Sequence, residues 1–164
     1  MSRYLTDEQQ KIREIKENKK QYLDLLLLAD EQEDMIDRYL ERGIMYVLDD
    51  NGIKAECVVT DEGDGILEIK NLAVTPDSQR RGYGRRMIRF LADTYSGRYD
   101  ILQVGTGDSP LTVPFYESCG FRKSYVVKGF FTKYYDHPIY EDGRQLADMV
   151  YLRMSLTSET GLEK

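Results

Sequence analysis

The spacing of apolar residues in the first part of the chain predicts two short helices. Apolar side chains recur at helical intervals over 22–29 and again over 31–42. We expect Asp30 and Glu33 to form the N-terminal box of the second helix, and Gly43 to end it. Two helices in succession are therefore predicted before the first long strand.

The apolar period then changes to two, which is typical of strands with one buried face. Segment 11–16 fits an edge strand or the end of a preceding helix, and we favour the strand. The turn 49–52 contains Asn51 and Gly52, which readily adopt the positive φ of a tight hairpin. The strands predicted here are 45–48, 53–60 and 66–74, with a second, acidic turn at 61–65.

Helices and strands alternate in the second part of the chain. An amphipathic pattern predicts a helix over 82–95, and a shorter helix over 111–118 ends at Gly120. Further strands are predicted over 101–104, 121–131 and 149–156, with a long aromatic loop between the last two. This order predicts an α/β (α+β) fold in which helices cover a mixed sheet.

Composition narrows the class of protein. The chain has 164 residues, of which 41% are hydrophobic and 32% charged. These values fit one domain over 1–164. We expect 1–10 to be an extra helix or flexible extension and 157–164 to be a flexible tail. Two cysteines and one histidine, without metal-ligand spacing, argue against a metal site. No apolar run approaches the roughly 20 residues that span a bilayer, so we expect a cytoplasmic protein without membrane contact. A net charge of -6 disfavours nucleic acid and favours a cationic substrate.

The segment Leu72–Arg85 carries recognisable chemistry, because a strand leads there through a Gly-rich turn into a helix. Backbone N–H groups at a helix N-terminus bind phosphate, and glycine lets a diphosphate approach the main chain. Arg80, Arg81 and Arg85 add positive charge. A dinucleotide fingerprint would need glycine at Met87, and the Gly-Lys-Ser/Thr of a P-loop is absent, so neither motif explains the turn.

Two motifs carry a family resemblance. The first is Gln79-x-x-Gly82-x-Gly84 after Leu-Ala-Val at a strand end, and the second is the run Phe-Tyr-Glu-Ser-Cys-Gly-Phe over 115–121. Together they resemble the GNAT superfamily of acetyl-CoA-dependent N-acetyltransferases, over about residues 11–156 in element order. The resemblance implies a mixed, mostly antiparallel central sheet flanked by helices, with the cofactor in a wedge between the fourth and fifth strands.

The resemblance also implies which residues hold acetyl-CoA, the co-substrate. The strand segment 72–74 would pair with the pantetheine arm, backbone N–H groups of 80–85 would hold the pyrophosphate, and 101–106 would form the second wall of the wedge. Ser109 stands where the family commonly has asparagine and keeps a hydroxyl donor with a shorter reach. The implied cofactor-binding residues are Leu72, Ala73, Val74, Gln79, Arg80, Arg81, Gly82, Tyr83, Gly84, Arg85 and Ser109.

The implied reaction is direct attack of a neutral primary amine on the thioester through a tetrahedral intermediate, whose oxyanion a backbone N–H near Val74 would stabilise. Tyr116 occupies the position of the family's tyrosine. Its ordinary pKa of ~10 keeps it protonated at neutral pH, so it could give its proton to the departing sulfur. Packing of Tyr116 in the sheet is the alternative, and we favour the catalytic role.

The general base has two candidates. Glu68 matches a carboxylate that acts through water in some family members, although a surface charge alternating with Lys70 fits equally well. His137 is the second candidate because its ordinary pKa of ~6.5 suits the task. Val104 stands where other members carry a glutamate as the base, so that route is not supported here. Cys119 could carry an acyl group, but the role of a buried packing residue fits it better.

The expected acceptor site lies beneath the aromatic segment 130–142, where Tyr134, His137 and Tyr140 are the candidate substrate-binding residues. Aromatic rings and nearby carboxylates favour a cationic amine, either a small molecule or a peptide. The competing interpretations are a non-catalytic sensor or scaffold domain that binds acetyl-CoA, and a protein or peptide N-acetyltransferase. The sequence leaves the oligomeric state, including a homodimer, open.

Overall fold

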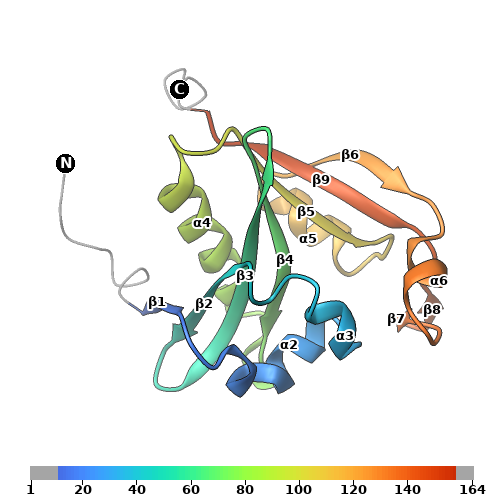
Figure 1. The fold of residues 1–164 in the computed structure, drawn as a ribbon, viewed down its shortest axis with the longest axis horizontal. Coiled ribbons are helices and arrows are strands. Elements are labelled where there is room, and N and C mark those ends of the chain that lie inside the picture. Colours follow the sequence, from blue (N-terminus) through green and yellow to red (C-terminus); the bar gives the residue numbers. More distant parts are fainter. Residues whose placement is uncertain (1–10, 158–164) are drawn as a thin grey trace. The chain divides into compact units, whose positions relative to one another are not determined.

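Strand pairing joins seven strands into one mixed sheet. The computed structural model describes residues 11–157, and the sheet runs in the order β1-β2-β3-β4-β5-β9-β6 (Figure 1). β4 and β5 pair in parallel, whereas β1–β2, β2–β3, β5–β9 and β6–β9 pair antiparallel, which confirms the expected mixed, mostly antiparallel sheet. The strands are β1 Ile12–Ile15, β2 Ile44–Asp49, β3 Ile53–Gly63, β4 Ile66–Val74, β5 Ile101–Gly107, β6 Arg122–Val127 and β9 Met149–Ser155.

The chain divides into two compact units, and strands β3 and β4 each contribute to both. Within the described residues, the first unit holds 11–60 together with Lys70–Tyr95. The second unit holds Asp61–Ile69 together with 96–157. The cofactor-binding turn predicted from the sequence therefore belongs to the first unit, and Glu68 and Tyr116 belong to the second.

Helices cover both faces of the strands in the first unit. Val47 on β2 and Val58 on β3 are buried in one cluster with residues of α2 and α3, among them Ile36. Tyr46 points to the opposite face, where its hydroxyl lies 2.7 Å from the hydroxyl of Tyr95 at the end of α4. The helical elements here are η1 Lys19–Tyr22, α2 Leu23–Ala29, α3 Glu33–Ile36, η2 Pro76–Ser78 and α4 Tyr83–Tyr95.

Strand register aligns rows of side chains across the sheet of the second unit. β4 and β5 are paired from Ile66–Ile101 to Ile69–Val104, and β9 pairs with both β5 and β6. Side chains alternate between the two faces along each strand, and register partners on neighbouring strands point to the same face. Register partners therefore form rows that run across the strands. The remaining elements of this unit are α5 Val113–Ser118, α6 Phe130–Tyr134, β7 Tyr140–Glu141 and β8 Arg144–Gln145.

The second helix is much shorter than the sequence predicts. α3 ends at Ile36, and the chain reaches Gly43 through successive turns instead of the helix expected over 31–42. The predicted N-terminal box is wrong as well, because the N-cap is Gln32, with no side-chain cap hydrogen bond. Asp30 instead accepts a hydrogen bond from the Tyr39 hydroxyl at 2.9 Å.

The strand predicted over 121–131 is present, but its predicted end and the long loop after it are wrong. β6 ends at Val127, and Gly129 adopts φ 68° at the start of α6. The Gly129 N–H donates to Asp148 at 2.9 Å, and the Phe131 N–H donates to the Ala147 carbonyl at the same distance. These bonds close the segment into a helix followed by the two-stranded β7–β8 sheet, so it is an ordered element.

The other predicted strands and helices are present, with ends that move by a few residues, and segment 11–16 contains strand β1 as expected. The extensions predicted over 1–10 and 158–164 lie outside the described residues. No helix within 11–157 has the length and apolar character needed to cross a membrane.

Candidate active site

The Gly-rich turn of the first unit leaves space beside its backbone. β4 ends at Val74, and the chain turns through Arg80, with φ 67°, and Gly82, with φ 87°, into α4. A Cβ placed on Gly82 would have no heavy atom within 4 Å. Glycine therefore satisfies the positive φ of this position, and the open space fits a ligand that approaches the main chain closely.

The N-terminus of α4 supplies backbone donors at the same place. The Arg86 N–H bonds back to the Gly82 carbonyl at 2.9 Å, so the N–H groups of Tyr83, Gly84 and Arg85 precede the first intrahelical bond. Arg80 and the following arginines add positive charge, so the turn fits an anionic diphosphate in both charge and geometry.

The Tyr83 side chain anchors this turn to the neighbouring hairpin. Its hydroxyl donates to Asp50 Oδ2 at 2.7 Å, and Asp50 also pairs with Lys11 at 2.9 Å. The hydrogen bond to the Asp50 carboxylate raises the pKa of Tyr83. The side chain is buried, so only the backbone of Tyr83 remains for a cofactor.

The segment 72–74 is held in an extended conformation by its neighbours. The Thr75 N–H donates to the Lys54 carbonyl at 2.9 Å, which continues the pairing of β4 with β3 past Val74. Gln79 Nε2 contacts the Val74 carbonyl at 3.3 Å, so this side chain links the strand end to the Gly-rich turn. The exposed Gln79 side chain therefore stabilises the conformation of the turn by an intramolecular hydrogen bond.

In the second unit, Glu68 is one end of a polar row that crosses three strands. Gln103 Nε2 donates to Glu68 Oε1 at 2.7 Å, and Arg153 Nε donates to Gln103 Oε1 at 2.7 Å. The three residues are register partners on β4, β5 and β9. Because a carboxylate only accepts and a guanidinium only donates, the two ends fix the orientation of the Gln103 amide.

Glu68 is only 6% exposed, so the alternative of a surface charge is wrong. Gln103 is equally buried at 4%, and the hydrogen bond between them is therefore shielded from water. A carboxylate held in one geometry by a buried donor suits proton transfer better than a mobile surface group.

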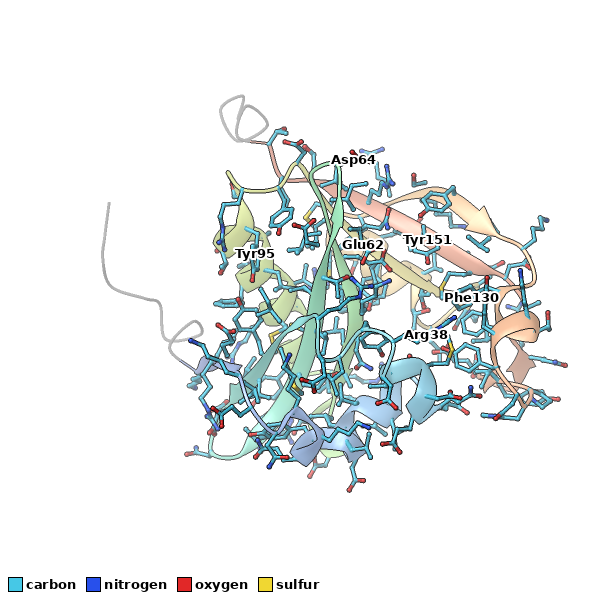
Figure 2. All side chains as sticks on the ribbon, viewed as in Figure 1. Arg38, Glu62, Asp64, Tyr95, Phe130 and Tyr151 are labelled. Carbon is cyan, nitrogen blue, oxygen red and sulfur yellow. The ribbon has the colours of Figure 1, made fainter. Side chains whose placement is uncertain are left out.

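An aromatic pair lies beside this row. The rings of Tyr125 and Tyr151 stack with centroids 4.6 Å apart, and the Arg153 guanidinium lies 5.5 Å from the centroid of Tyr125. Burial raises the pKa of Tyr151, and the nearby Glu68 charge raises it further. Figure 2 shows Tyr151 on β9, and a Cβ on Gly105 would approach its Cε1 to 2.8 Å. Glycine at 105 therefore makes room for the tyrosine ring.

Tyr116 is buried on α5 against two phenylalanine rings. Its ring centroid lies 5.1 Å from that of Phe115 and 5.6 Å from that of Phe121, both with edge-to-face geometry. The Phe121 N–H donates to the Tyr116 carbonyl at 3.1 Å, and Gly120, with φ 109°, allows this helix end. The motif read from the sequence thus sets the orientation of the tyrosine ring.

Ser109 precedes α5, and its observed hydrogen bonds are local. Its hydroxyl oxygen accepts a hydrogen bond from the Leu111 N–H at 3.0 Å, and its carbonyl accepts from the Val113 N–H at 3.2 Å. The side chain is buried. The hydroxyl proton remains the group that Ser109 could offer to a cofactor.

The proposed acceptor residues differ in their surroundings. Tyr134 and Tyr140 are exposed, at 37% and 58%. Phe130, labelled in Figure 2, lies on α6, and its ring centroid is 4.9 Å from that of Tyr134. His137 Nδ1 lies 2.6 Å from Asp136 Oδ1 on the protein surface. The small buried cluster of Phe131, Ile139 and Leu146 holds the segment together.

The two cysteines are not part of these clusters. Cys57 is fully buried, which raises the pKa of its thiol. Cys119 is only partly buried, so the expectation of a buried cysteine holds less well there. Within residues 11–157, no three His, Cys, Asp or Glu side chains come together as a metal-binding group.

Three residues that the motifs do not include are Gln103, Arg153 and Glu56. Gln103 and Arg153 orient Glu68, while Glu56 is completely buried on β3. The sequence gives no signal for the burial of Glu56, because Lys54 and Glu56 alternate with apolar residues as on a solvent-facing side of a strand. Gln103 and Arg153 carry no signal either, because their pairing depends on the register between β5 and β9.

Comparison with known proteins agrees with this fold and these motifs. The model of the acetyltransferase (GNAT) domain matches residues 41–123. An uncharacterized N-acetyltransferase, YvbK of Bacillus subtilis, is 35% identical over 136 residues, which cover 81% of this chain and 88% of that protein. The chain belongs to the GNAT acetyltransferase family and is an acyltransferase.

Solved structures of the family show the same fold. A GNAT family acetyltransferase from Elizabethkingia anophelis with acetyl-CoA bound has a TM-score of 0.83 and 33% identity, covering 88% of this chain and 96% of that one. An acetyltransferase from Bacillus subtilis in complex with CoA has a TM-score of 0.81 and 32% identity, covering 88% and 97%. The predicted family and the predicted fold class are therefore confirmed.

Proposed function

We propose that this acetyltransferase uses acetyl-CoA to acetylate a primary amine. The open turn at Gly82, at the N-terminus of α4, is the observation that carries the proposal, because its N–H groups and positive charge fit a diphosphate. Two similar structures contain acetyl-CoA or CoA. The residues assigned to the cofactor are those of segment 72–74, those of turn 79–85 and Ser109.

Acetyl-CoA would supply an activated acetyl group as a thioester: the amine nitrogen bonds to the acetyl carbon, the C–S bond breaks, and coenzyme A leaves as a thiol after protonation. Tyr116 would donate its hydroxyl proton to the departing sulfur, a contribution of about 10²- to 10⁴-fold. Its burial between two aromatic rings supports this role, because the ring has little freedom to turn away. His137 lies exposed on the surface and suits the role of base less well than the buried Glu68.

Glu68 would accept a proton from the acceptor, directly or through water. A primary amine with a pKa of ~10.4 is mostly protonated at neutral pH, and forming its neutral form costs about 4.6 kcal/mol at pH 7. Gln103 and Arg153 hold the carboxylate of Glu68 in place for this step. The proton passes from the amine nitrogen to the Glu68 carboxylate and then to solvent.

Replacement of Gly82 by valine tests the cofactor site. The β-branched side chain disfavours φ 87° and occupies the space left for the diphosphate, so acetyl-CoA affinity should fall at least tenfold in calorimetry. Gly97→Val is the matched control, because Gly97 has φ 90° and open surroundings in the turn after α4. Equal affinity for acetyl-CoA in both variants would contradict the assignment.

Turnover separates an enzyme with an amine acceptor from a domain that only binds the cofactor. Thiol release from acetyl-CoA is measured across a panel of primary amines with wild type and Tyr116→Phe. We expect amine-dependent release in wild type and a kcat about 10²- to 10⁴-fold lower in the variant. Cofactor binding without amine-dependent release would contradict acetylation of an amine.

A further inference from the structure

Three side chains of the first unit have buried oxygen atoms without a hydrogen-bond partner. They are both carboxylate oxygens of Glu56, Oδ1 of Asn71 and Oγ1 of Thr75. Glu56 has no exposed surface, and Asn71 is 3% exposed. An unpaired buried acceptor costs roughly 1–3 kcal/mol, and a carboxylate costs more, so four such atoms call for an explanation.

Strand register places Glu56 and Asn71 at neighbouring positions on one face of the sheet. The bond from the Thr75 N–H to the Lys54 carbonyl sets β3 and β4 so that Glu56 lies opposite Ala73. Asn71 and Thr75 flank Ala73 at alternate positions, on the same face of the strand. The Ala73 N–H acts on the Glu56 carboxylate, although it makes no well-aligned hydrogen bond with it.

The orientation of Asn71 is fixed by its other contacts. Asn71 Nδ2 donates to the Leu26 carbonyl at 3.0 Å and contacts the Tyr39 hydroxyl at 3.1 Å. The Leu26 carbonyl can only accept, so the amide nitrogen must lie on that side. The Tyr39 hydroxyl in turn donates to Asp30. The Asn71 oxygen is therefore turned away from these partners and cannot gain one by a flip of the amide.

Buried acceptor oxygens without partners fit a cation that brings its own N–H groups. A primary ammonium has N–H donors and one positive charge, which match the carboxylate of Glu56 and the amide oxygen of Asn71. Thr75 is four strand residues from Asn71, about 13 Å, so one ammonium cannot reach both. Resting on the proposed function, we infer that Glu56 and Asn71 bind the ammonium group of the acceptor. Ala73 belongs to the segment assigned to the pantetheine arm, so an amine held here would lie beside the acyl group.

Helices α2 and α3 cover this face. Val47 is the register partner of Glu56 and packs against residues of both helices in one core cluster. The helices have seven and four residues, and neither N-cap makes a side-chain hydrogen bond. Access to Glu56 therefore requires these helices to move, and binding must offset the apolar packing that is lost.

The first test uses n-butylammonium as a probe with the full chain. Its addition should raise the melting temperature of wild type, whereas tetramethylammonium, with the same charge and no N–H donor, should not. Glu56→Gln should abolish the rise, and Glu14→Gln, at an exposed position on β1, should keep it. Asn71→Leu removes the amide oxygen at a similar side-chain volume and should weaken the response. It provides the test if Glu56→Gln does not fold.

Equal responses to n-butylammonium in wild type and Glu56→Gln, or no response in wild type, would overturn the inference. A second arm uses any amine that wild type acetylates. Glu56→Gln should raise its KM at least tenfold while acetyl-CoA affinity by calorimetry stays unchanged. Loss of acetyl-CoA binding in wild type would instead contradict the proposed function, so the two failures are distinguishable.

Discussion

Two buried glutamates on neighbouring strands have opposite surroundings. Glu68 on β4 accepts a 2.7 Å hydrogen bond from Gln103, which Arg153 fixes from the other side. Glu56 on β3 is more deeply buried, and neither of its oxygens has a hydrogen-bond partner. Burial raises the pKa of Glu56 well above its ordinary value, and the Ala73 N–H opposes this only in part.

The difference indicates two separate tasks. A carboxylate with its own donors is held in one geometry without a ligand, as a proton acceptor requires. A buried carboxyl group without donors favours its neutral form until a cation arrives and stabilises its charge, as a binding site for a cation requires. We therefore assign proton transfer to Glu68 and recognition of the ammonium group to Glu56, and each prediction below tests one side of this division.

The largest effect is expected for Glu68→Gln. The amide keeps the shape of the side chain and loses the proton acceptor, so kcat should fall by about 10²- to 10⁴-fold. Acetyl-CoA affinity should stay the same, and the basic-amine pH profile should move upward. Glu62→Gln, on an exposed part of β3, is the control for a lost negative charge near Tyr151. An unchanged kcat and pH profile in Glu68→Gln would remove Glu68 from the reaction.

A smaller effect is expected when the partner of Glu68 is removed. Gln103→Met keeps the length of the side chain but breaks both 2.7 Å bonds, so the unfolding free energy should fall by about 1–3 kcal/mol. Loss of orientation should also reduce kcat roughly tenfold, a barrier change of about 1.4 kcal/mol. Double variants with Glu68→Gln give the coupling. Additive effects on kcat would show that Gln103 does not act through Glu68.

The stability of Glu56→Gln against pH tests the other carboxylate. The pKa of Glu56 is raised in the folded protein, so its contribution to stability is present below the ordinary value of 4.5 and is lost as pH rises toward the folded pKa. Wild type should therefore lose stability relative to Glu56→Gln across this window, by up to about 1.4 kcal/mol per pH unit.

Asp49 is a control for this measurement because its pKa shift, and so its effect on the pH dependence of stability, has the opposite sign to that of Glu56. The Arg13 guanidinium lowers the pKa of Asp49, so its contribution is present above the ordinary value and is lost as pH falls. Asp30 and the Tyr39 hydroxyl lie near Glu56 and are unchanged in Glu56→Gln. Parallel stability curves for wild type and Glu56→Gln, measured by urea unfolding, would show that Glu56 has no raised pKa.

The sequence predicts the fold well where local signals and packing agree. The hairpin at Asn51-Gly52, helix α4 and the Gly120 helix end all follow from turn residues and apolar spacing. The helix predicted over 31–42 is too long, because the apolar residues after Ile36 lie in turns. Asp30 accepts a hydrogen bond from Tyr39 instead of capping the helix. The strand predicted through to residue 131 ends early because Gly129 turns the chain after β6. The Gly129 N–H donates to Asp148, which is distant in sequence, so this turn could not be predicted from local residues.

The site divides in the same way. Motifs identify the Gly82 turn and Tyr116, since each depends on residues close in sequence. The partners of Glu68 and the unpaired oxygens around Ala73 depend on strand register, which brings residues far apart in sequence into rows. Sequence analysis could name Glu68 as a candidate base but could not show what holds it.

The smallest effect is expected for Tyr134→Ala combined with Tyr140→Ala. If Glu56 provides the charge that binds the ammonium group, these exposed tyrosines supply only apolar and cation–π contacts, worth about 0.5–1 kcal/mol each at exposed sites. The acceptor KM should then rise roughly 5- to 30-fold, because the two losses together are about 1–2 kcal/mol. Leu111→Ala, at another exposed apolar position, is the control.

The same double variant shows whether Glu56 or the aromatic segment 130–142 contributes more to binding of the acceptor. Tyr134 and Tyr140 lie on a segment with its own small core, so their removal should leave the melting temperature nearly unchanged. A KM effect larger than that of Glu56→Gln would place the recognition of the cation on the aromatic segment. An unchanged KM for every accepted amine would remove Tyr134 and Tyr140 from the acceptor site and leave Glu56 as the residue that selects a charged amine.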